Sequence, residues 1–331
     1  MRFALAAFAL LAACSSTPST PTVVDAGSHD VSADPDVSAL DAGADAAAPE
    51  DLPVVTEDVP AADVPPEVAR LVSERPYLLR VSGEYRAGTP APLLILLHGY
   101  GASGLLQESY FRLTREADAR GFLYAIPDGT RDMGGMRFWN ATSACCDFGR
   151  TGVDDVAYLT AIIDDVSARY SVDPRRIYFV GHSNGGFMSH RMACARSNRV
   201  AAIISLAGAA PSPSDCSPTE RVSVLEVHGT ADGTIQYEGG STPGGAFTSA
   251  QVTVAGWATR NGCDAALTDD ARTLDLDTSL AGAETRVQRH DNCGAGGAAE
   301  LWSIDGGAHL PAMGNNWAPA VFDWLLAHPK P

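Results

Sequence analysis

The sequence predicts an α/β domain whose central sheet is mostly parallel and flanked by helices. From about residue 75, short apolar runs alternate with stretches whose apolar residues recur at helical spacing. The run at 91–101 is continuously apolar and ends in glycines, as expected of a strand buried on both faces of a parallel sheet. Strands that alternate with helices predict βαβ units, whose functional residues gather at the carboxyl ends of the strands.

Six apolar runs are expected to form the strands. They lie at residues 91–101, 121–129, 176–183, 200–208, 222–229 and 299–307. The clearest helix is expected over 153–170, because its apolar residues fall on one face and Pro174 follows its end. A short amphipathic helix is expected over 318–328. The chain shows no internal repeat.

The first residues are typical of an export signal. Arg2 precedes a short apolar run, and residues 1–13 end in small side chains before Cys14. The stretch Leu-Ala-Ala-Cys resembles a bacterial lipobox, which implies cleavage before Cys14, lipid attachment to its thiol and anchoring to a membrane. Ser15 then suggests the outer membrane. The alternative is an ordinary secretory signal with a chance cysteine. Either interpretation predicts an exported protein.

A tether is expected to follow the signal. With Cys14, residues 14–65 form a segment rich in Ala, Asp and Pro that has no Lys, Arg or large aromatic residue. It holds eleven acidic residues, so −11 of the formal net charge of −17 belongs to it. Such a composition predicts a disordered linker, which leaves 66–331 as a single catalytic domain. The acidic balance gives no reason to expect nucleic-acid binding.

Six cysteines remain once Cys14 is set aside. An even number in an exported protein predicts disulfides. Neighbourhood in the sequence favours Cys194–Cys216 and Cys263–Cys293, and leaves Cys145 and Cys146 to pair with each other or to rearrange the set. No C-x-x-C or cysteine–histidine cluster has zinc spacing, so no metal site is expected.

A serine between glycines follows the run at 176–183. The segment GHSNG, residues 181–185, has the pattern G-x-S-x-G, and in a strand–turn–helix context this is typical of a nucleophile elbow. The elbow would expose the hydroxyl of Ser183 above the sheet. The same glycines also suit an ordinary tight turn, so the interpretation depends on partners elsewhere in the chain.

Two polar residues follow later strands in the order that a Ser-Asp-His triad requires. Asp232 comes after the run at 222–229, and His309 after the run at 299–307. Because the carboxyl ends of parallel strands share one edge, these residues are expected to converge on Ser183. His309 would then be the general base, and Asp232 would orient its imidazole. The alternatives are His228 and His290 for the base, and Asp215, Asp264, Asp270, Asp275, Asp277, Asp291 and Asp305 for the acid.

Two backbone N–H groups are expected to form an oxyanion hole. The residue after the nucleophile, Asn184, supplies one of them. The loop that ends the run at 91–101 supplies the other, with the amide of Tyr100 as first choice and that of Gly101 as second. Two histidines of these turns, His98 and His182, are expected to be structural, and His182 and Gly101 are candidates for lining the substrate site.

Several motifs, taken in order, resemble one family. They are LLILLHGYGASG, RFWNATSACC, YFVGHSNGGFM, LEVHGTADGTIQYEGG and IDGGAHLP. Together they are similar to the secreted polyhydroxybutyrate depolymerase-like proteins, a group that includes feruloyl and acetylxylan esterases. The resemblance implies an α/β-hydrolase fold and ester hydrolysis through the residues named above. It also implies that Trp139 walls the acyl pocket, for which core packing is the alternative.

One position departs from the family's pattern. Members commonly carry Trp-Pro-Gly shortly after the catalytic histidine, whereas this chain reads HLPA at residues 309–312. The missing tryptophan would have offered a flat surface to a polymer or an aromatic acid. The departure leaves the triad intact but weakens any substrate assignment by resemblance.

The sequence therefore predicts an exported serine esterase that needs no cofactor. Its substrate would be a polyhydroxyalkanoate-type polyester, or a feruloyl or acetyl ester of a polysaccharide. The alternative is a catalytically idle α/β-hydrolase domain that serves as an envelope-binding lipoprotein. Turnover of any ester by the purified protein distinguishes the two.

Overall fold

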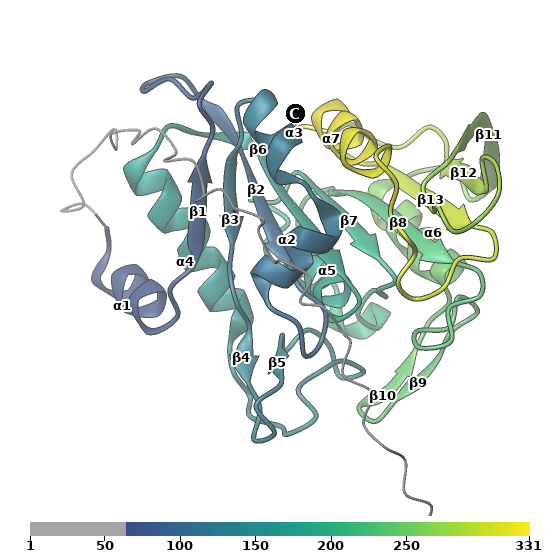
Figure 1. The fold of residues 1–331 in the computed structure, drawn as a ribbon, viewed down its shortest axis with the longest axis horizontal. Coiled ribbons are helices and arrows are strands. Elements are labelled where there is room, and N and C mark those ends of the chain that lie inside the picture. Colours follow the sequence, from purple (N-terminus) through teal and green to yellow (C-terminus); the bar gives the residue numbers. More distant parts are fainter. Residues whose placement is uncertain (1–63) are drawn as a thin grey trace, which may run out of the picture. The chain divides into compact units, whose positions relative to one another are not determined.

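The structure is a computed structural model that describes residues 64–331 (Figure 1). In chain order its elements are α1 (Pro66–Glu74), β1 (Leu78–Val81), β2 (Ala91–Leu97), α2 (Gly104–Phe111), α3 (Thr114–Ala119), β3 (Leu123–Ile126), β4 (Thr130–Arg131), β5 (Arg137–Phe138), α4 (Asp155–Arg169), β6 (Val172–His182), α5 (Asn184–Ala195), β7 (Ala202–Leu206), β8 (Ser223–Gly229), β9 (Gly240–Thr242), β10 (Gly245–Phe247), α6 (Ala250–Asn261), β11 (Leu267–Leu274), β12 (Thr285–His290), β13 (Ala299–Ile304) and α7 (Trp317–Ala327). The expected signal peptide, Cys14 and the tether up to residue 63 lie outside the described residues. Within 64–331, no helix is both long and apolar enough to cross a bilayer.

The main sheet has nine strands in the order β1-β3-β2-β6-β7-β8-β13-β12-β11. The strands from β3 to β13 in this order run parallel, and β1, β12 and β11 pair antiparallel at the two edges. The mostly parallel α/β sheet predicted from the apolar runs is confirmed. Its carboxyl edge brings together the loops that follow β2, β6, β8 and β13.

Helices cover both faces of this sheet, as Figure 1 shows. The strand β2 is buried along its whole length, and its side chains alternate between two cores. Leu93 and Ile95 belong to the core shared with helices α4, α5 and α6. Leu94 and Leu96 belong to the core shared with α2, α3 and α7. Burial on both faces explains why the strand is a continuous apolar run.

Capping residues set the ends of the long helices. The expected helix over 153–170 is α4, and it begins one residue after Asp154, whose side chain accepts the N–H of Ala157. Helix α6 begins after Ser249, which accepts the N–H of Val252, and ends at Gly262 in the left-handed conformation. The apolar pattern predicted α4, and capping residues decided the bounds of both helices.

The antiparallel pair β11–β12 was not expected from the sequence. Strand β11 reads LTDDARTL, and most of its side chains are exposed or half-buried because it lies at the edge of the sheet. A charged edge strand discourages pairing with other chains. It also lacks the apolar run that predicted the central strands.

Three disulfides link the six cysteines of the described residues. They are Cys145–Cys146, Cys194–Cys216 and Cys263–Cys293. The last two are the pairs that neighbourhood in the sequence favours, and of the two alternatives left open for Cys145 and Cys146 the structure has the vicinal pair. The second ties the end of α5 to the segment after β7, and the third ties the end of α6 to the segment after β12.

Candidate active site

Ser183 lies in the sharp turn between β6 and α5. Its backbone has φ 53° and ψ −120°, a conformation that L-residues rarely adopt. The flanking glycines allow the turn because they have no side chain. Neighbouring backbone atoms occupy the space that a Cβ would need. A Cβ on Gly181 would lie 2.1 Å from the carbonyl oxygen of Gly185, and a Cβ on Gly185 would lie 2.2 Å from that of Leu97. The strand–turn–helix geometry is that of a nucleophile elbow.

Asp232 and His309 come together at the carboxyl ends of the paired strands β8 and β13. His309 donates from Nδ1 to Oδ2 of Asp232 at 2.7 Å. The other carboxylate oxygen of Asp232 accepts the backbone N–H groups of Thr234 and Ile235, at 2.8 and 2.9 Å. The aspartate is thereby held rigid, and the donation from Nδ1 leaves Nε2 of His309 as the basic nitrogen.

The contacts of His182 bring Ser183 and His309 close to each other. The ring of His182 lies 4.8 Å from the ring of His309, centroid to centroid, and its Nε2 donates to the backbone oxygen of His309 at 2.9 Å. Within residues 64–331, no hydrogen bond joins Oγ of Ser183 to His309. Contacts of this kind are often long before substrate binds. The next residue in the chain after His182 is Ser183 itself.

The two expected oxyanion donors belong to segments next to the serine: Asn184 follows it in the chain, and Tyr100 follows Gly99, which lies close to it. Asn184 is the first residue of α5, so its N–H has no partner inside the helix. Gly99 is close enough that a Cβ there would lie 3.5 Å from Cβ of Ser183. In the described chain, the amide of Tyr100 donates to no protein acceptor, whereas that of Gly101 donates to the carbonyl of Arg137 at 2.8 Å. Tyr100 therefore fits the second donor better than Gly101.

Trp139 does not line an open pocket. Its side chain is fully buried, and its indole N–H donates to the carbonyl of His98 at 3.0 Å. Its backbone N–H donates to Oδ1 of Asn184 at 2.7 Å, and its carbonyl accepts from Nδ2 of Asn184 at 2.9 Å. The expectation of an acyl-pocket wall is corrected to core packing. The tryptophan backbone instead holds the side chain of Asn184, the expected oxyanion donor, through two hydrogen bonds.

His182 is also a packing residue rather than a substrate contact. Its side chain is buried, and burial lowers its pKa to about 3. The hydrogen bond to the His309 backbone fixes the loop that carries His309. This is the structural role that the sequence favoured, whereas burial argues against the candidate role in lining the substrate site.

His98 supports the loop on the other side of the serine. Its Nδ1 donates to the carbonyl of Gly99 and its Nε2 accepts the N–H of Gly129, both at 2.8 Å. Burial lowers the pKa of His98 to about 4. The ring is thus neutral, and protonation would break its bond with Gly129.

His98 and His182, whose pKa values are lowered by burial, predict a loss of stability in acid. In the unfolded chain both would titrate near 6.5, so their stabilising contribution is complete above that pH and is lost as pH falls toward the folded values. Each adds a slope of up to about 1.4 kcal/mol per pH unit to the free energy of unfolding between roughly pH 6.5 and 4. Urea unfolding at stepped pH measures this slope. We expect His98→Gln to reduce the slope, and an unreduced slope in this variant would contradict the prediction.

A hollow of about 480 Å³ adjoins the vicinal disulfide. It is bordered by the loop from Asn140 to Gly152 and by Pro243 and Gly244 of the β9–β10 hairpin. The hairpin is fastened to the loop by a hydrogen bond from Thr242 Oγ1 to the carbonyl of Ala144. Cys145 in turn lies 3.5 Å from Nδ2 of Asn184. Cys145 and Asn184 therefore lie between the hollow and the turn at Ser183.

Exposed apolar side chains border the same region. Tyr100 and Phe148 are 37% and 38% exposed, and their rings lie 5.6 Å apart. Tyr100 is held by a hydrogen bond from its hydroxyl to Asp132 at 2.5 Å. The aromatic pair therefore begins at the residue whose backbone amide is the expected second oxyanion donor.

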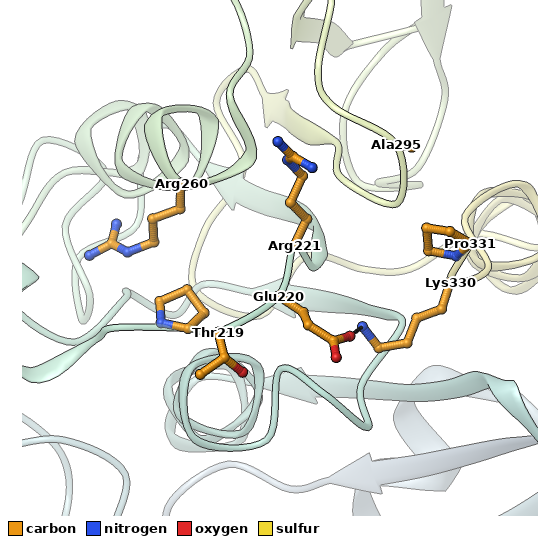
Figure 2. A pocket seen from close by; sticks show the side chains of 8 residues that line it. Thr219, Glu220, Arg221, Arg260, Ala295, Lys330 and Pro331 are labelled. Carbon is orange, nitrogen blue, oxygen red and sulfur yellow. Dashed lines mark hydrogen bonds and ion pairs between the residues drawn. The ribbon is translucent and has the colours of Figure 1, made fainter.

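A second hollow, of about 450 Å³, lies at the other end of the strands (Figure 2). It is bordered by residues that precede β8 and β13, namely Thr219, Glu220, Arg221 and Ala295, together with Arg260 and Lys330. Figure 2 shows the carboxylate of Glu220 paired with Lys330, at 2.7 Å. Asp232 and His309 follow the opposite ends of the same strands, so this hollow is separate from the candidate site.

Comparison with known proteins relates the chain to esterases. Residues 84–254, just over half of it, match a protein family described as phospholipase/carboxylesterase. NocK of Nocardia uniformis subsp. tsuyamanensis, classed provisionally as an esterase, is 32% identical over 223 residues, which cover 62% of this chain and 63% of NocK. Feruloyl esterase B of Piromyces equi is 28% identical over 255 residues, which cover 72% of this chain and 43% of that protein. The chain thus spans less than two thirds of either relative.

A solved structure shares the fold. An acetyl xylan esterase from Aspergillus awamori aligns with a TM-score of 0.53 at 13% identity, over 75% of this chain and 93% of that one. The expected α/β-hydrolase fold is confirmed. The motif-based resemblance to feruloyl and acetylxylan esterases is confirmed as well.

Proposed function

The chain belongs to the phospholipase/carboxylesterase family, and from this premise we propose that it hydrolyses carboxylic esters with Ser183 as the nucleophile. The observation that carries the proposal is the 2.7 Å hydrogen bond between His309 and Asp232. It lies at the sheet edge where Ser183 adopts its strained turn. A serine elbow, an imidazole and a carboxylate in this arrangement are the parts of a hydrolytic triad.

In the proposed reaction, Oγ of Ser183 is the nucleophile and Nε2 of His309 is the base. Nε2 of His309 accepts the proton of Ser183 Oγ as the oxygen attacks the ester carbonyl. The amides of Tyr100 and Asn184 donate to the oxyanion of the tetrahedral intermediate. His309 then protonates the departing alcohol, which leaves an acyl group on Ser183. Water activated by the same imidazole releases the acid, and Asp232 stabilises the imidazolium in both steps.

The aromatic pair beside the site supports an aromatic or bulky acyl group. Tyr100 and Phe148 offer two exposed ring faces next to the oxyanion donors. They stand in for the flat surface that the segment HLPA lacks. We infer that a feruloyl-type ester is a better substrate than an acetyl ester, with a polyhydroxyalkanoate chain as the polymeric alternative.

Two methyl esters test the activity and the acyl preference together. Methyl ferulate and methyl acetate release the same alcohol, so a pH-stat compares their acyl groups alone. We expect kcat/KM to be higher for methyl ferulate, and Phe148→Ala to lower it about 2- to 10-fold on that ester only, as expected for loss of one aromatic contact. Val252→Ala, which removes an exposed apolar side chain of α6, is the control.

Three outcomes decide between the candidate functions. Turnover of neither methyl ester nor of a polyhydroxybutyrate suspension would contradict the proposed activity and favour the idle lipoprotein. Clearing of the suspension without turnover of methyl ferulate would favour the polyester. An equal effect of Phe148→Ala on both methyl esters would contradict the role given to the aromatic pair.

We further propose that the enzyme acts outside the cytoplasm. The lipobox-like stretch before Cys14 supports export and attachment to a lipid membrane. The acidic segment 14–65 would then hold the catalytic domain, 66–331, away from that membrane. The three disulfides of the domain are compatible with an oxidising compartment.

A further inference from the structure

A row of buried side chains lies behind Asp232, and the proposed mechanism does not use it. Glu226 and His228 are two residues apart on β8, so their side chains point to the same face of the sheet. Both are essentially inaccessible to solvent. His190 of α5, also buried, lies against Glu226, and the buried Trp257 of α6 lies against His190. A buried carboxylate with two buried imidazoles requires compensating partners.

The partners of His190 determine where its proton lies. Its Nδ1 faces the indole N–H of Trp257 at 3.0 Å, and an indole nitrogen can only donate. Nδ1 is therefore an acceptor and carries no proton. Its Nε2, which lies 2.9 Å from Oε2 of Glu226, carries the proton and donates to that oxygen. His190 is neutral, and one oxygen of Glu226 is occupied by an obligatory donor.

The second oxygen of Glu226 also receives a fixed donor. Oε1 accepts the backbone N–H of Gly208 at 3.2 Å, and Nδ1 of His228 lies at the same distance. N–H groups point at both oxygens of Glu226, and this favours the ionised carboxylate over the protonated acid. Burial alone would raise the pKa of Glu226, but the hydrogen bonds from His190 and His228 lower it below its usual range.

His228 then faces acceptors on both sides of its ring. Nδ1 faces Oε1 of Glu226, and Nε2 lies 2.7 Å from the carbonyl oxygen of Ile235 and 3.4 Å from Oδ2 of Asp232. A carbonyl and two carboxylates can only accept. Each nitrogen must therefore carry a proton, and a histidine with two N–H groups is a cation.

We propose that His228 is a buried imidazolium held between Glu226 and Asp232, and that it is a positioning residue that keeps Asp232 ionised and aimed at His309. The proposal rests on the proposed function, since Asp232 matters in this way only if His309 is the base. His228 was considered from the sequence as an alternative base. Its contacts give it a different role. It contacts Asp232, which in turn contacts His309, so His228 does not itself touch the reacting atoms.

The charges around His228 come from several elements. Glu226 and Asp232 flank it on its own strand and loop, and the edge of the Tyr237 ring covers it, with centroids 5.6 Å apart. Beyond Asp232 stands His309, and the neutral His182 of β6 lies on the same side. Burial lowers the pKa of His228, but the hydrogen bonds with Asp232 and Glu226 more than offset this and raise it to about 9. Two anions and one cation leave a net charge of −1 facing His309.

The charges of Glu226, His228 and Asp232 together determine how strongly the catalytic groups attract a proton. Burial raises the pKa of Asp232, but the hydrogen bonds from His228 and His309 hold it well below its usual range. The cation also offsets part of the field of the two carboxylates at His309. Without it, the anions would favour protonated His309, and the enzyme would need a higher pH to be active.

Nitrogen NMR on the wild-type protein tests the charge directly. Histidine labelled with ¹⁵N reports the protons on each ring nitrogen, and His228 can be assigned through its contact with Tyr237. We expect both nitrogens of His228 to carry protons at about pH 7.5, while His190 shows one bare nitrogen. A bare nitrogen on His228 at that pH would overturn the proposal. This result needs no turnover, so it stands apart from success or failure of the proposed activity.

The pH profile of kcat/KM tests the consequence. In His228→Gln, which cannot be charged, we expect the acid limb to move upward by on the order of one pH unit, together with a lower kcat. His328→Gln, at the end of α7, is the matched control and should leave the limb in place. A lower kcat with an unmoved limb would show a merely structural role and overturn the inference. If His228→Gln does not fold, the NMR result decides alone.

Discussion

Replacing Ser183 with alanine is expected to lower kcat on methyl ferulate by roughly a million-fold, the scale seen when a triad nucleophile is removed. No other hydroxyl is expected to replace it, because the elbow aims this one side chain above the sheet edge. The pair His309–Asp232 is untouched by the change, as are the amides of Tyr100 and Asn184. KM is therefore expected to change little. Initial rates from a pH-stat measure both parameters.

Ser167→Ala is the matched control for this variant. Ser167 lies near the end of α4, where its hydroxyl donates to the carbonyl of Ile163 at 2.7 Å, and it precedes the amino end of β6, opposite to the end that carries Ser183. It should retain wild-type rates. Residual activity of Ser183→Ala above about one part in a thousand, with an unchanged unfolding midpoint, would rule out Ser183 as the nucleophile.

Replacing Gly185 with alanine is expected to destabilise the protein by about 3 kcal/mol, the upper part of the usual range for overpacking. The new Cβ would lie 2.2 Å from the carbonyl oxygen of Leu97 and 2.8 Å from that of His98. Both are backbone atoms at the end of β2, so they cannot rotate away as a side chain would. The gain in helix propensity, at most about 1 kcal/mol, does not compensate.

The same clash should lower activity in the molecules that remain folded. Helix α5 can accommodate the new methyl group only by moving away from β2, which separates the amide of Asn184 from that of Tyr100. Gly83→Ala is the control, because no atom lies within 4 Å of its added Cβ. Urea unfolding measures the stability, and kcat per folded molecule measures the site. A change below about 0.5 kcal/mol would show that the elbow is looser than its contacts indicate.

Local chemistry made much of the molecule predictable. The runs that became β2, β6, β7, β8 and β13 are mostly apolar because both of their faces are covered by helices, with Glu226 and His228 of β8 as buried exceptions. The glycines around Ser183 predicted the turn, since only residues without a Cβ fit against the neighbouring carbonyls. Asp232 and His309 were found from their order in the chain, because parallel strands deliver the residues that follow them to one edge.

Other features left no local pattern. Trp139 was expected at a pocket, and its burial depends on how a distant loop lies against His98 and Asn184. Strand β11 was missed because an edge strand pairs through its backbone and carries polar side chains. Neither kind of contact changes the periodicity of the segment that makes it.

By itself, the sequence determined which segments become the central parallel strands and helix α4, where the elbow turns, and the order of the three candidate triad residues, because these depend on side-chain type and spacing along one segment. Only the tertiary structure decided that Gly101 is already hydrogen-bonded, that Asn184 is clamped by Trp139, and that the ring of His228 meets acceptors on both sides. Protonation and hydrogen-bond roles depend on which atoms face each other across the fold. Those atoms belong to residues far apart in the chain, and packing alone brings them within reach.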